Sequence, residues 1–149
     1  MISKYFTIDD LTRSATAKRL GLSNVPTPQH EAALKTLAEN VLDKIYDHFK
    51  RNVNITSGYR SEALNKAVKG SLTSQHSKGE AADLTGIGKV KNADIFNFIK
   101  ENVDFDQLIW EFGSATEPDW VHVSYKALNR RQILKAIKEG GKTIYKPYR

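Results

Sequence analysis

The segment 29–49 constrains the fold of this chain most, because its apolar side chains recur at steps of three and four residues. This spacing predicts one long amphipathic helix with a single apolar face. We expect the helix to build the core and to carry no chemistry. Its apolar positions are Ala33, Leu34, Leu37, Ala38, Val41, Leu42, Ile45 and Phe49.

Shorter patterns predict the remaining elements. Capping residues and apolar spacing indicate further helices, and short β-branched or alternating runs indicate strands. We expect an α+β fold, in which a small antiparallel sheet packs against helices. A Gly/Ser/Pro-rich turn should join the adjacent strands 106–112 and 120–125. The expected helices are residues 8–21, 61–68, 92–102 and 129–139, and the expected strands are 53–57, 81–84, 106–112, 120–125 and, at an edge, 142–145.

Length and composition place limits on the class of protein. The chain has 149 residues, so we expect one domain over 1–149, monomeric in solution. It has no cysteine, so any metal must be held by His, Asp or Glu. No apolar stretch approaches the ~20 residues that span a bilayer, and the N-terminus lacks the apolar core of a signal peptide. We therefore expect synthesis in the cytoplasm and no membrane insertion.

The net charge of +6 permits an anionic partner such as nucleic acid, a membrane surface or a cell-wall polymer. Basic residues are scattered, with one denser stretch at 126–149. The simpler interpretation is a solvated surface. We expect no nucleic-acid partner, because no recognised binding motif and no platform of aromatic and basic residues is present.

Two short segments carry the residues best suited to chemistry, 74–83 and 118–124. They supply His76, Asp83 and His122, a ligand set that suits Zn²⁺ and leaves a coordination position for water, as in catalytic zinc sites. Each residue alone could equally be a surface histidine or a capping acid, and no compact metal signature is present. The set nevertheless indicates metal-assisted hydrolysis.

Strand geometry allows the three side chains to converge. In an extended segment His122 lies on the face opposite Val121 and Val123, which can point to the core. Asp83 has apolar neighbours on both sides and can likewise face outward. His76 lies in the polar loop just before, so all three can meet on one face of the sheet.

Four motifs resemble those of the zinc D-alanyl-D-alanine carboxypeptidases. That family includes phage endolysins that cleave the L-alanyl-D-glutamate bond of peptidoglycan, and it shares its fold with the hedgehog signalling domain. Residues 6–28 resemble the lead-in of its small phage and prophage branch. No recognisable wall-binding repeat follows, unlike in two-domain endolysins. The motifs are Ser57-Gly-Tyr-Arg60, Ser74-Gln-His76, Gly79-Glu-Ala-Ala-Asp83 and Trp120-Val-His122-Val-Ser124.

The resemblance implies a zinc peptidase acting on peptidoglycan stem peptides at the cell wall, as an endopeptidase or a D,D-carboxypeptidase. Its single Zn²⁺ would be held by His76, Asp83 and His122. Asp119, three residues before the second histidine, occupies the place of the family's catalytic acid, where some members carry Glu. A non-catalytic zinc module that binds a wall peptide or a protein is the alternative.

Several roles around the site stay open. Arg60 matches the arginine of the family motif and could bind a substrate carboxylate or the developing oxyanion, or form a structural salt bridge. Glu117 competes with Asp119 as proton carrier, and Glu111 could assist. The polar residues expected to contact substrate or support the site are Ser57, Gln75 and Ser124.

Overall fold

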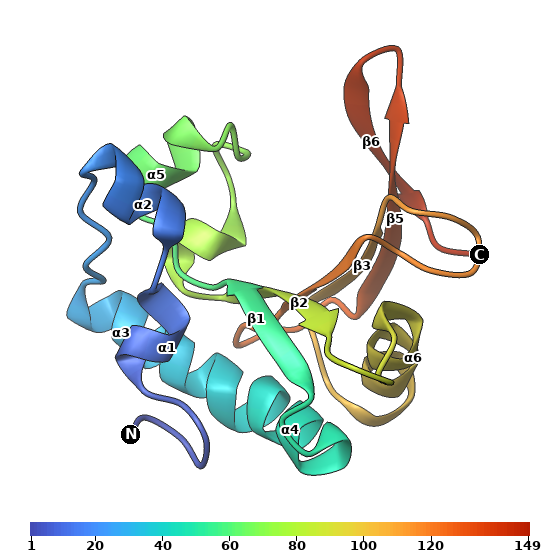
Figure 1. Cartoon of the computed structure of the whole chain (residues 1–149), viewed down its shortest axis with the longest axis horizontal. Coiled ribbons are helices and arrows are strands. Elements are labelled where there is room, and N and C mark those ends of the chain that lie inside the picture. The colour runs from blue at the N-terminus through green and yellow to red at the C-terminus, as the bar shows by residue number, and fades with distance from the viewer.

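A six-stranded sheet organises the chain, in the order β1-β2-β4-β3-β5-β6. The computed structural model describes residues 1–149. Figure 1 shows α3, α4 and α6 along one side of the sheet, with the β5–β6 hairpin rising away from them at one end. The elements are α1 (Ile8–Thr12), α2 (Ala15–Leu20), α3 (Pro28–Leu37), η1 (Ala38–Leu42), α4 (Asp43–Phe49), β1 (Val53–Ser57), α5 (Glu62–Ala67), η2 (Gln75–Lys78), β2 (Ala81–Gly86), α6 (Asn92–Asn102), β3 (Gln107–Glu111), β4 (Trp120–Ser124), β5 (Gln132–Glu139) and β6 (Lys142–Pro147).

The α+β class is confirmed, and the sheet is antiparallel in every pairing except that of β3 with β5. The long helix predicted from the apolar spacing is also present, as α3, the π-helical turn η1 and α4 in direct succession. Its apolar face is almost completely buried in the core. The fully or nearly fully buried residues of that face are Leu34, Leu37, Ala38, Val41, Leu42 and Ile45.

The two central strands present one apolar and one polar face. Val121 and Val123 of β4 are fully buried in the core. His122 lies between them and must point to the other face, since side chains alternate along a strand. Asp83 of β2 is the direct cross-strand partner of His122, and such partners share a face. Helices α3, α4 and α6 therefore cover the apolar face, and the polar residues share the other.

The prediction of one helix over 8–21 is wrong. Arg13 is extended, and Ser14 starts a second helix by accepting a hydrogen bond from the backbone N–H of Ala17 at 3.1 Å. The cap competes with helix continuation, because a serine side chain replaces the backbone as acceptor. Gly21 ends α2 in the left-handed conformation.

The prediction of a basic helix over 129–139 is also wrong. Residues 132–139 form β5, which pairs in parallel with β3. The four-residue step from Ile133 to Ile137 resembles a helix pattern, but the open edge of β3 offers backbone partners that outweigh this weak local preference. Gly140 and Gly141 turn the chain into the next strand, with φ of 58° and 77°. The edge strand expected after them is confirmed as β6.

Candidate metal centre

The side chains of His76, Asp83 and His122 converge on the open face of the sheet. Oδ1 of Asp83 lies 3.3 Å from Nε2 of His76 and 3.2 Å from Nδ1 of His122. One ligand atom from each residue lies within 4.8 Å of the other two. The cluster combines η2, β2 and β4, segments that only the folded chain brings together.

His76 presents a single ring nitrogen to this cluster. Its Nδ1 lies 2.7 Å from the carbonyl oxygen of Gly58, to which it donates a hydrogen bond because a carbonyl can only accept. This contact fixes the tautomer and leaves Nε2 free as a ligand, an arrangement found around metal-bound histidines. Gly79 lets η2 turn against α3, with φ of 75°; a Cβ at this position would lie 2.6 Å from the carbonyl oxygen of His30.

Asp83 is ready to act as an anionic ligand. Burial by itself would raise the pKa of its carboxyl group, but the charges and hydrogen bonds of His76 and His122 outweigh burial and hold that pKa well below its usual range. A histidine binds a metal in its neutral form, which no longer supplies the charge that lowers this pKa. A buried anion between two imidazoles is costly without a cation to compensate it.

The donor set fits zinc. Two nitrogens and one carboxylate oxygen are borderline-hard ligands that Zn²⁺ accepts in tetrahedral geometry. Bonds of about 2.0–2.1 Å in a tetrahedron place neighbouring ligand atoms about 3.3 Å apart, and the two separations at Asp83 are 3.3 and 3.2 Å. Three protein ligands leave the fourth position open, as in catalytic rather than structural sites.

Asp119 lies immediately before β4, outside the regular alternation of the strand. Its carboxylate is exposed and makes no hydrogen bond or ion pair within the chain. The backbone around it is fixed: Nδ2 of Asn92 donates to the carbonyl oxygens of Pro118 and Asp119 at 3.0 and 2.9 Å. Asp119 is thus a free acid on an anchored backbone. Asn92 provides the anchor, and no pattern in the sequence distinguishes it.

Glu117, the competing acid, is already engaged. Its Oε1 accepts a hydrogen bond from the backbone N–H of Ala93 at 2.6 Å. Ala93 lies in the first turn of α6, where backbone N–H groups have no partner within the helix. Glu117 therefore accepts a hydrogen bond from a backbone N–H at the start of α6 and ties the loop before β4 to that helix. Asp119 has no such structural contact.

Glu111 lies on the metal face of β3. Its cross-strand partner is Trp120, two residues before His122 on the same face. Burial, together with the charge of Asp83, raises the pKa of Glu111 to about 7, although His122 lowers it. A buried carboxyl group that titrates near neutral pH is typical of acid–base sites, so Glu111 is a second acid within the field of the cluster.

Arg60 has no carboxylate partner. No Asp or Glu oxygen lies within 4.0 Å of its guanidinium, so the salt bridge considered for it is absent. Its Nη2 makes one long contact, 3.4 Å from Oγ of Ser74, and its Nε is buried without an acceptor. Burial lowers its pKa, opposed by the charge of Asp83. A half-buried guanidinium with unused donors is suited to an anionic ligand.

The other predicted polar residues have different surroundings. Ser57 pairs with Asp83 across β1 and β2, and together with Arg60 it lines a cavity of about 200 Å³. Gln75 donates to the carboxylates of Glu80 and Asp106. Ser124 is completely buried, and its hydroxyl accepts a hydrogen bond from the backbone N–H of Gln107 at 3.0 Å. Ser124 thus contributes to the packing of the sheet, and the substrate contact predicted for it stays a prediction.

An α+β fold with a three-donor cluster that leaves one coordination position open is typical of a metallohydrolase. Residues 4–124 match the model of the family described as peptidase M15. The chain belongs to this family of zinc metallopeptidases, which act on peptidoglycan peptides. No curated protein matches the chain. None of its helices has the length and apolar character needed to cross a membrane. The match leaves β5 and β6 outside it.

Proposed function

We propose that this chain hydrolyses a peptide bond of peptidoglycan stem peptides at the bacterial cell wall, as an endopeptidase or a D,D-carboxypeptidase. The observation that carries the proposal is the cluster of His76, Asp83 and His122, whose ligand atoms all lie within 4.8 Å of one another. These three residues would hold one zinc ion, and the domain over 1–149 would act as a monomer. An origin in a phage or prophage is part of the same proposal and rests on the resemblance of residues 6–28.

The residues divide the chemistry between them. Zinc, when bound, supplies a water of lowered pKa and polarises the scissile carbonyl group. Asp119 takes a proton from the attacking water as general base and delivers it to the leaving amine as general acid. Arg60 holds a carboxylate of the peptide or the carbonyl oxygen as negative charge develops there. Glu111, buried next to the cluster, is the alternative carrier of the proton.

A digestion experiment tests the activity. Purified muropeptides are incubated with the zinc-loaded protein and analysed by mass spectrometry. Loss of a terminal residue would define a carboxypeptidase, and an internal cut an endopeptidase; a chelator should stop either reaction. Intact muropeptides that bind without being cut would instead favour the non-catalytic zinc module.

Variants of the three acids test the mechanism. Asp119→Asn should lower turnover by roughly 10²–10⁴-fold, the usual contribution of acid–base catalysis, with zinc content and fold unchanged. Glu117→Gln is the matched control: it should retain turnover and lose some thermal stability, since it weakens the contact to Ala93. Full activity of Asp119→Asn with an inactive Glu111→Gln would transfer the proton-carrier role to Glu111.

A further inference from the structure

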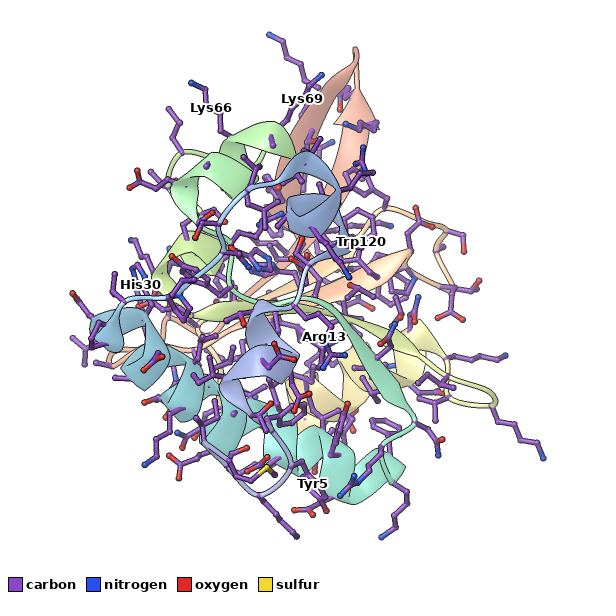
Figure 2. The ribbon with its side chains drawn as sticks, turned by 60° about the vertical axis from the view of Figure 1, so that its left-hand side comes forward. Tyr5, Arg13, His30, Lys66, Lys69 and Trp120 are labelled. Atoms are coloured by element: carbon purple, nitrogen blue, oxygen red, sulfur yellow. The ribbon has the colours of Figure 1, made fainter.

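The β5–β6 hairpin carries one of its side chains to the metal face of the sheet. Glu111 of β3 pairs with Trp120 on one side and with Ala136 of β5 on the other, and Ala136 pairs with Tyr145 of β6. Cross-strand partners share a face, so Tyr145 ends a row that begins beside His122. Figure 2 shows Trp120, a member of this row, on the opposite side of the sheet from Tyr5, which contacts α4.

Nothing large separates Tyr145 from the site. The residue between it and Glu111 is alanine, whose side chain is completely buried. Tyr145 itself is 54% exposed, so its ring is open to a ligand. Burial of the remainder and the charges of Glu111 and Asp83 raise the pKa of Tyr145, whereas Arg60 lowers it. The phenol thus lies in the field of the same groups that surround the metal cluster.

Two donors in the surroundings of the metal cluster lack an acceptor within the chain; one of them, Arg60, is joined to His76 through its backbone N–H. The hydroxyl of Tyr145 makes no hydrogen bond within the chain, and Arg60 has a buried Nε without a partner. The charge of each acts on the other group. Buried polar groups are normally hydrogen-bonded, so the unused Nε of Arg60 favours an acceptor from outside the chain. The hydroxyl of Tyr145 is exposed and free to donate to the same acceptor.

We propose that Tyr145 is a substrate-binding residue, whose hydroxyl donates a hydrogen bond to a carboxylate of the stem peptide that Arg60 also holds. This inference rests on the proposed function and extends it to a strand that the family match does not include. The C-terminal hairpin then forms one wall of the binding site and takes part in selecting peptides that carry a free carboxylate at that position.

Binding of the cleaved peptides tests the proposal independently of turnover. Calorimetry with the zinc-loaded protein should give a Kd about tenfold or more higher for Tyr145→Phe, the usual effect of losing a hydrogen bond to a charged group. KM should rise in parallel, with kcat within about twofold. Tyr148→Phe is the matched control, because Tyr148 packs against Phe96 and Trp110 in the core. Its affinity should equal that of the wild type.

Peptides with each carboxylate amidated in turn identify the acceptor. One of them should bind the wild type more weakly and lose all sensitivity to Tyr145→Phe. An unchanged Kd for a folded Tyr145→Phe protein would overturn the proposal, as would a fall in kcat alone, which would place the hydroxyl at the reacting carbonyl. Binding that depends on Tyr145 without any hydrolysis would refute the proposed function and keep this inference. If no stem peptide binds the wild type, both are wrong.

Discussion

Asp106 provides the sharpest test of how the site is held in place. Its carboxylate is completely buried beside the segment that carries His76. Arg130 donates to it from its backbone N–H and from Nε and Nη2 of its side chain, at 2.9, 3.0 and 2.7 Å, and Gln75 adds a fourth hydrogen bond at 3.0 Å. Burial would raise the pKa of Asp106, but these hydrogen bonds prevail and lower it from 3.8 to about 2.

The size of the effect follows from this shift. One pKa unit corresponds to about 1.4 kcal/mol, so the ionised carboxylate contributes about 2 kcal/mol to the free energy of unfolding. Because the folded-state pKa is the lower one, this contribution is complete above the unfolded pKa of 3.8 and disappears as the pH falls through about 2. Asp106→Asn should therefore lower Tm by roughly 4–8 °C at neutral pH.

Urea denaturation of the metal-free protein between pH 2 and pH 8 measures the difference directly. The gap between wild type and Asp106→Asn should be constant above about pH 5 and shrink toward pH 2. Asp104→Asn is the matched control, since Asp104 is 84% exposed and lies 3.7 Å from Arg131; it should cost at most about 0.5 kcal/mol. Equal losses in the two variants, or a gap independent of pH, would refute the reasoning.

Two further predictions concern the site itself. His76→Ala and His122→Ala should each abolish hydrolysis and reduce bound zinc, measured by atomic absorption after gel filtration; full zinc occupancy in the double variant would contradict the ligand assignment. Arg60→Lys should lose most activity at unchanged Tm, because lysine keeps the charge but lacks the planar pair of donors; an unchanged rate with a lower Tm would show that Arg60 serves the fold alone.

Local sequence patterns predicted the central part of the molecule. The long helix, the inner strands and the convergence of His76, Asp83 and His122 follow from periodicity, alternation and the family resemblance. These signals depend on residues close together in the chain. The predictions failed where a partner distant in the sequence decides the conformation. Residues of β5 form a strand because they pair with the edge of β3. No pattern within 129–139 indicates that this edge is available.

The predictions of site residues succeeded and failed for the same reason. Residue types indicated a metal site, and the family resemblance implied its three ligands. The engagement of Glu117 by Ala93, the anchoring of the loop by Asn92 and the position of Tyr145 arise from contacts between segments far apart in the sequence. Tyr145 had no distinguishing signal, because a tyrosine in an edge strand is ordinary until its row across the sheet is known.

The sheet ends at β6, whose outer side has no further strand beside it. An uncovered edge of this kind is a template for another chain, and proteins commonly protect it with lysine and proline. β6 carries Lys142, Lys146 and Pro147 within six residues, and mutual repulsion of the lysines opposes the approach of a second copy. The same strand that brings Tyr145 to the metal face thus guards the molecule against strand-to-strand aggregation.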